Sequence, residues 1–87
     1  MATVAAFEID GLKLWFWSDD HDPPHFHAKR AGEWEVKVHF LNDASEMIEE
    51  EWTVKKPSGH KLKELRTLAE THRVELLEEW DKIRENQ

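Results

Sequence analysis

Residues 25–41 read HFHAKRAGEWEVKVHFL, and the alternation in this stretch decides the fold that the sequence predicts. Apolar and polar residues alternate on both sides of the Ala31-Gly32 pair, which is typical of two antiparallel strands joined by a tight turn. We therefore expect strands over His25–Lys29 and Glu33–Leu41. The register of this hairpin determines the face on which its histidines lie.

Two loop lengths are open for the hairpin, and they place His25 and His27 on opposite faces. A two-residue loop at Ala31-Gly32 puts both histidines on the apolar face of the second strand. A three-residue loop over Arg30–Gly32 turns them to the other face, and its glycine then takes the left-handed position. We favour the longer loop because it matches apolar residues across the strands. The predicted pairs are Phe26 with Val36 and Ala28 with Trp34.

A second hairpin is predicted upstream, where Asp10-Gly11 separates two β-rich runs, Ala5–Ile9 and Leu12–Trp17. This dipeptide is preferred in type I′ turns, whose two central residues both have positive φ. The core face of this hairpin would carry Phe7, Ile9, Leu12, Leu14 and Phe16. The opposite face would carry Lys13, Trp15 and Trp17.

The second half of the chain predicts one more strand and a helix. Met47–Val54 alternates, with Ile48, Trp52 and Val54 expected inward. Ser58 is a candidate N-cap, and His60–Arg84 carries the apolar stripe of one long helix with a kink near Glu70–Arg73. The predicted fold class is α+β: an antiparallel sheet of four to five strands, two hairpins plus a further strand, with this C-terminal helix packed on one face.

Length and composition limit the classes of protein that this chain can belong to. Its 87 residues predict a single domain spanning 1–87. The absence of cysteine excludes disulfides and thiolate metal sites, and a net charge of −7 disfavours broad attraction to nucleic acid. No apolar run is long enough to cross a membrane, and the first ten residues lack the pattern of a secretory signal, so a cytoplasmic location is expected.

The stretch HDPPHFH, residues 21–27, concentrates histidines next to a stiff Pro-Pro pair. Histidines two apart on a strand share a face, and neutral imidazole is a common ligand of zinc and related divalent transition metals. The candidate ligands are His21, His25, His27 and His39, with Asp19, Asp20 and Asp22 as additional carboxylates. The alternative is a hydrogen-bonded histidine pair with Glu35 and no metal.

The same face of the sheet offers a candidate binding surface. Exposed aromatic rings on a small domain are typical of a partner or ligand site. The predicted binding face consists of Trp15, Trp17, Lys29 and Glu35.

Three segments resemble one known family over most of the chain. They are DGLKLWFW at 10–17, SDDHDPPHFHAKRAGEWEV at 18–36 and LAETHRVELLEEWDKI at 68–83. They are similar to the aromatic strand, the Asp-His-x-Pro-Pro-His-x-His signature and the closing helix of the family catalogued as domain of unknown function 4160. The resemblance implies a small α+β bacterial protein of unassigned activity, and for some members a place in toxin–antitoxin-type pairs.

Three classes of function are compatible with these features. The first is a protein-interaction module, with a protein partner or a second copy of the chain, whose histidine cluster holds a metal. The second is a small ribonuclease-like enzyme that uses His25 and His27 as general base and general acid. The third is a structural subunit of a larger complex. We favour the first, because the sequence lacks a catalytic triad order, a Gly-rich phosphate loop and a paired-carboxylate motif.

Overall fold

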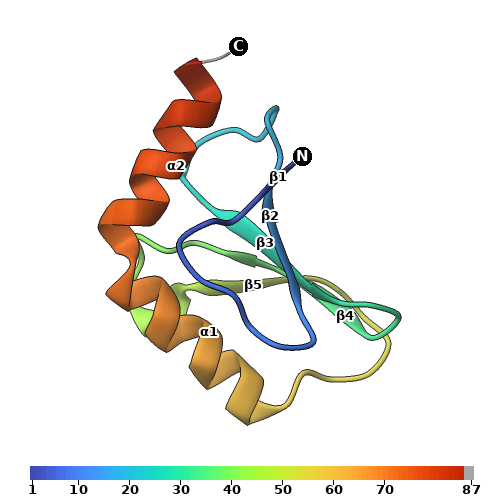
Figure 1. Cartoon of the computed structure of the whole chain (residues 1–87). Helices are drawn as coiled ribbons and strands as arrows, with labels where there is room; N and C mark the ends of the chain where they lie inside the picture. The colour runs from blue at the N-terminus through green and yellow to red at the C-terminus, as the bar shows by residue number, and fades with distance from the viewer. Residues whose placement is uncertain (86–87) are drawn as a thin grey trace.

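The computed structural model describes residues 1–85 and has the predicted α+β architecture (Figure 1). Five strands form one antiparallel sheet in the order β1-β2-β3-β4-β5. The strands are β1 (Ala2–Thr3), β2 (Lys13–Phe16), β3 (Phe26–Arg30), β4 (Trp34–Val38) and β5 (Ile48–Thr53), with a short 3-10 helix η1 (Ala44–Glu46) before β5. Two helices follow, α1 (Gly59–Thr71) and α2 (Arg73–Glu85).

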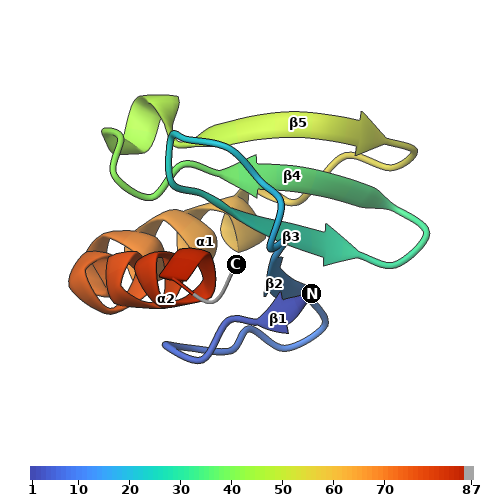
Figure 2. The same cartoon turned by 90° about the horizontal axis from the view of Figure 1, so that it is seen from above.

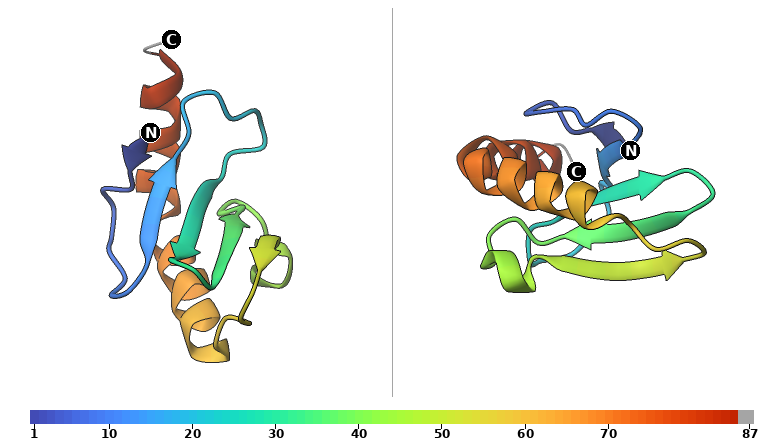
Figure 3. Two further views of the ribbon diagram at one scale, coloured as in Figure 1. Left: turned by 90° about the vertical axis from the view of Figure 1, so that its right-hand side faces the viewer. Right: turned by 90° about the horizontal axis from the view of Figure 1, so that it is seen from below.

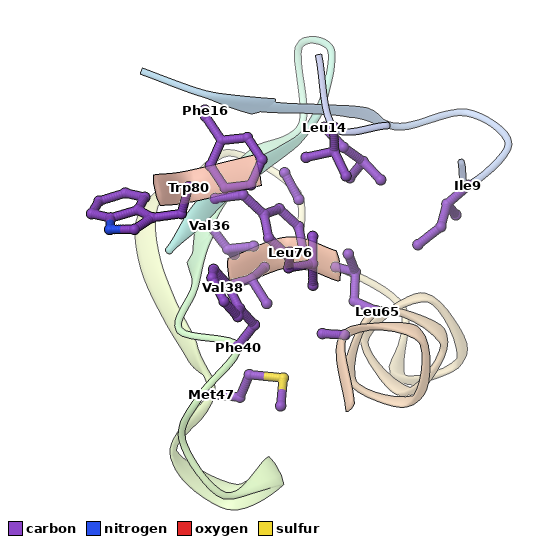
Figure 4. Packing of buried hydrophobic residues seen from close by; sticks show 14 of the residues in the cluster. Ile9, Leu14, Phe16, Val36, Val38, Phe40, Met47, Leu65, Leu76 and Trp80 are labelled. Atoms are coloured by element: carbon purple, nitrogen blue, oxygen red, sulfur yellow. The ribbon is translucent and has the colours of Figure 1, made fainter. Parts of the chain in front are cut away.

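The helices lie along one face of the sheet, and β5 is the edge strand that is farthest from them (Figures 2 and 3). Figure 4 shows the core between the two layers, where Leu65, Leu76 and Trp80 pack toward the sheet. The sheet contributes Leu14, Phe16, Phe26, Ala28, Trp34, Val36 and Val38 to the same cluster. No helix within residues 1–85 combines the length and apolar character needed to cross a membrane.

The predicted long helix is two helices that meet at His72, inside the segment where a kink was expected. Ser58 caps α1 as predicted, with its hydroxyl accepting the Lys61 N–H at 3.1 Å. The start of α2 is anchored elsewhere, because the Arg73 guanidinium donates to the carbonyls of Phe40 and Asn42, each at 2.7 Å. The chain changes direction at this break, so α1 and α2 do not form one straight helix (Figure 1).

The predicted strand over Ala5–Ile9 is wrong. The segment before the turn is a loop, and β1 is only Ala2–Thr3, paired with Phe16 and Trp15. The amides of Ala5 and Ala6 donate to the carboxylate of Glu79 in α2, at 2.7 and 3.0 Å, so they are not available to a strand ladder. The turn itself is present, but only Gly11 has positive φ, which excludes the predicted type I′ geometry.

The β3–β4 register differs from the predicted one by two residues. Phe26 pairs with Val38 and Ala28 pairs with Val36. The loop is Ala31–Glu33, closed by a hydrogen bond from the Glu33 N–H to the Arg30 carbonyl at 2.9 Å. A shift of two residues keeps every side chain on its face. His27 therefore lies on the predicted face despite the wrong register.

The inward orientation predicted for Trp52 and Val54 is also wrong. Glu35 pairs with Trp52 but Val36 pairs with Glu50, so Glu51 is an extra residue in β5. This bulge reverses the alternation after Glu50. Trp52 is 38% exposed and Val54 is 80% exposed, while Ile48, which precedes the bulge, is half-buried as expected.

Replacing Gly32 with valine is expected to destabilise the protein by about 1–2 kcal/mol more than replacing Ala31 with valine. Gly32 has φ +76, and a Cβ built there meets no atom within 4 Å, so the penalty comes from the backbone alone. The neighbouring Ala31 is an exposed loop residue without positive φ and is the matched control. Urea denaturation of the two variants measures the difference, and equal losses would contradict it.

Candidate metal centre

The loop between β2 and β3 folds back so that Asp20 faces the start of β3. The chain turns here, and the Asp20 N–H donates a hydrogen bond of 3.4 Å to the Trp17 carbonyl. Arg84, near the end of α2, donates from its guanidinium to the Asp20 carbonyl. The loop is thus held by a hydrogen bond to Trp17, which directly follows β2, and by another from Arg84 in α2, which is distant in sequence.

Three side chains converge at this point. Asp20 Oδ2 lies 2.8 Å from His27 Nε2 and 3.2 Å from His25 Nε2. Each residue offers one ligand atom, and the three atoms all lie within 4.8 Å of one another. His25 and His27 are 5% and 4% exposed, and the Asp20 side chain is 20% exposed. The cluster is therefore largely shielded from solvent.

The outer nitrogens of both imidazoles face oxygen acceptors. His25 Nδ1 lies 2.8 Å from the Pro23 carbonyl oxygen, and His27 Nδ1 lies 3.5 Å from Glu35 Oε2. A carbonyl only accepts hydrogen bonds, so His25 Nδ1 carries the proton and donates it. In the neutral ring, Nε2 then carries a lone pair directed at the Asp20 carboxylate.

Burial lowers the pKa of His25 from its ordinary value. The hydrogen bond to Pro23 and the charge of Asp20 oppose this shift, while the neighbouring imidazoles of His27 and His39 add to it. The neutral form is favoured by the larger effect, desolvation. A neutral His25 leaves a buried nitrogen lone pair and a carboxylate oxygen facing each other with no hydrogen atom between them.

Aromatic rings hold the two imidazoles in place. Trp15 stacks on His27 with ring centroids 5.3 Å apart and an interplanar angle of 19°. Trp80 from α2 packs against His25 at 5.5 Å. Stacked and packed rings leave each imidazole little rotational freedom, which is the condition for a preorganised ligand set.

The predicted binding face is only partly exposed. Lys13 and Lys29 lie over the Trp15 ring, with their Nζ atoms 5.6 and 5.8 Å from its centroid, and Trp15 is only 3% exposed. Trp17 is 40% exposed and is the open aromatic ring beside the cluster. The Glu35 side chain is 19% exposed and faces His27.

The structure brings together two of the four predicted metal ligands, His25 and His27. His21 is exposed and lies outside the group. His39 packs on His25, with ring centroids 5.3 Å apart, but its Nε2 hydrogen bonds with Glu49 at 2.8 Å. That hydrogen bond lowers the pKa of the Glu49 carboxyl.

Asp20 is the third member, and sequence reasoning did not single it out. Asp19, Asp20 and Asp22 flank His21 in a loop without periodicity, so spacing alone cannot select one of them. The choice depends on the way the loop folds back over β3. The sequence indicates only that a carboxylate close before the Pro-Pro-His-x-His stretch could join the histidines, and it does not indicate which one.

Comparison with known proteins gives one match. The model of the family described as domain of unknown function (DUF4160) matches residues 11–81, which is well over half of the chain. No curated protein and no solved structure matches. The match covers the sheet from the turn before β2 onward, the histidine cluster and most of α2. The chain therefore belongs to the DUF4160 family.

Proposed function

We propose that this domain binds one divalent transition-metal ion, with zinc as the reference case, through Asp20 Oδ2, His25 Nε2 and His27 Nε2. One observation carries the proposal: the buried Nε2 of His25 has no hydrogen-bond donor and faces a carboxylate oxygen at 3.2 Å. Two acceptors in contact repel each other unless a proton or a cation lies between them. A metal ion bound to both atoms removes that repulsion.

The surrounding contacts match those of histidine ligands in metal sites. Ligating histidines usually donate their second N–H to a backbone carbonyl or a carboxylate, which fixes the ring and its tautomer. His25 faces the Pro23 carbonyl in this way, and His27 faces Glu35. If His27 donates from Nδ1 to Glu35, its Nε2 also presents a lone pair to the ion.

The donor set favours a borderline metal such as zinc. Two imidazole nitrogens and one carboxylate oxygen are a common three-ligand set for zinc, and they leave one position of a tetrahedron for water or another donor. The chain has no cysteine, so the soft thiolate sites of many structural zinc domains are excluded.

The buried position of the rings supports a structural role within a protein-interaction module. An ion held by Asp20 and both histidines would fasten the loop over Ser18–Pro24 to β3, next to the exposed ring of Trp17. A ribonuclease-like role needs imidazoles within hydrogen-bond reach of a phosphodiester. Rings only 4–5% exposed, with both Nε2 atoms directed at one carboxylate, do not favour it. Membership of a toxin–antitoxin-type pair stays a prediction, which copurification with a single partner would support.

Metal stoichiometry tests the proposal. We expect untagged protein to bind one zinc ion per chain in native mass spectrometry and calorimetry. The His25→Ala variant should lose at least about 100-fold in affinity, and Glu35→Gln, which alters the outer contact of His27 and leaves the three ligands in place, about 10-fold. His21→Ala is the matched control, because His21 is an exposed histidine of the same loop and should leave affinity unchanged.

Equal zinc affinity in wild type and His25→Ala would show that any binding occurs elsewhere. No stoichiometric binding of zinc, nickel or cobalt would leave the hydrogen-bonded histidine–aspartate network as the correct description. The two results separate a misplaced site from an absent one.

A further inference from the structure

One edge of the sheet is long and free of a neighbouring strand. Within residues 1–85, β5 pairs only with β4, and β1 at the other edge has two residues while β5 has six. The His39 N–H donates to the Met47 carbonyl at 2.7 Å. Hydrogen-bonded and non-bonded pairs alternate along an antiparallel ladder, so the N–H of Glu50 points to the free side.

A groove runs beside this edge, between β5 and α1. It encloses a cavity of about 370 Å³, whose lining includes Val36, Ile48, Glu50, Leu62 and Arg66. In Figure 2, β5 is the strand farthest from α1 and α2, and the groove lies where Val36 and Ile48 of the sheet meet Leu62 and Arg66 of α1. Arg66 Nε is buried there and has no hydrogen-bond partner in the described chain.

The edge is acidic on the face opposite the groove. Glu49 bonds with His39, and Glu51 bonds with Lys37 at 3.0 Å, which raises the pKa of the lysine. The third glutamate, Glu50, forms no ion pair within residues 1–85 and lies on the groove side. A second copy of β5 would bring three more glutamates against these, and like charges across strands are destabilising.

We infer that the β5 edge and its groove bind an extended segment of a partner protein in which apolar residues alternate with Lys or Arg. The segment adds to the sheet as a further antiparallel or parallel strand beside β5. Its apolar side chains enter the groove over Ile48 and Leu62, and its basic side chains lie along Glu49 and Glu51. Strand addition to a free edge, with pockets for alternate side chains, is a recurrent mode of peptide recognition.

Charged residues on an edge strand also discourage aggregation, and this role is compatible with the three glutamates. It does not account for the cavity beside the edge, which is lined by Val36, Ile48 and Leu62 together with polar side chains that include Lys56, nor for a buried arginine nitrogen without an acceptor. The inference names the contact surface of an interaction module and does not depend on metal at the histidine cluster, although Glu49 bonds with His39, whose ring packs on His25.

A peptide titration followed by NMR tests the inference. The probe is acetyl-Lys-Val-Lys-Val-Lys-Val-Lys-amide, added to the full chain at low and moderate salt. We expect saturable amide shifts confined to β5 and to the groove side of α1, and weaker binding as salt rises. The charge-reversed peptide with Glu in place of Lys and a backbone N-methylated version of the basic peptide should bind at least tenfold more weakly.

Variants locate the contact. Glu50→Pro removes the outward N–H and should weaken binding at least tenfold, since proline is tolerated on a strand edge. The double variant Glu49→Gln/Glu51→Gln should weaken it mainly at low salt and tests the charge independently, should the proline variant not fold. Glu78→Gln, an exposed acid on α2, is the control that should keep the wild-type affinity.

Equal binding of the N-methylated peptide would exclude strand addition, and equal binding of the acidic peptide would exclude a basic partner. Absence of saturable binding by any peptide would also overturn the inference. A dimer in analytical ultracentrifugation that Glu50→Pro abolishes would make a second copy the occupant instead. Full binding by both Glu50→Pro and Glu49→Gln/Glu51→Gln, with loss of binding in His25→Ala/His27→Ala, would place the contact at the histidine cluster.

Discussion

Replacing Trp80 with alanine is expected to lower the free energy of unfolding by about 3–5 kcal/mol. Trp80 is 3% exposed and lies where α2 meets the sheet, with its ring centroid 6.4 Å from that of Phe16 and 5.5 Å from that of His25. Its removal leaves a cavity between the helices and the sheet, where Figure 4 places its ring, and it frees the His25 ring on one side. Chemical denaturation monitored by circular dichroism measures the loss.

Val74→Ala is the matched control for this prediction. Val74 belongs to the same helix but is 71% exposed, so the same type of truncation should change the free energy of unfolding by no more than about 0.5 kcal/mol. A loss below about 2 kcal/mol for Trp80→Ala, or similar losses for both variants, would mean that α2 does not pack on the sheet in this way.

Saturating zinc is expected to stabilise the wild-type fold by about 4 kcal/mol when its free concentration is 1,000 times the Kd. For a domain of this length, that gain raises Tm by about 15–30 °C. The effect follows from mass action, because the folded chain gathers Asp20, His25 and His27 while the unfolded chain does not. It should disappear with excess chelator, and it should weaken as the pH falls, because metal-ligating histidines must be deprotonated.

The variants give this prediction its specificity. His25→Ala/His27→Ala should melt at the same temperature with and without zinc, whereas His21→Ala should show the full wild-type shift. A shift that persists in the double variant would assign the stabilisation to other histidines, and a wild-type protein indifferent to zinc, nickel and cobalt would contradict the metal centre.

Features set by short stretches of sequence could be predicted well. The α+β class, the Ser58 cap and the positive φ of Gly32 all follow from residues within a few positions of one another. The face of the sheet on which His27 lies was also predictable. Its neighbours Phe26 and Ala28 are apolar and face the core, and a register shift of two residues leaves every side chain on the same face.

Features set by distant residues could not be predicted. The expected strand over Ala5–Ile9 is displaced by a carboxylate from Glu79, more than seventy residues away in sequence. The bulge at Glu51 reverses the orientation of Trp52 although the local pattern is regular. The place of Asp20 in the candidate site depends on the loop conformation, which is held by Arg84.

The contact between Arg84 and Asp20 has a consequence for the order of events during protein synthesis. The ribosome makes β2, β3 and both cluster histidines well before the helix that carries Arg84. Until α2 emerges, the nascent chain has the two imidazoles but lacks the guanidinium that holds the Asp20 loop and the Trp80 ring that packs on His25. The three proposed ligands are thus made early but are held in place only after α2 has emerged, so we expect an ion to bind only once α2 has packed on the sheet.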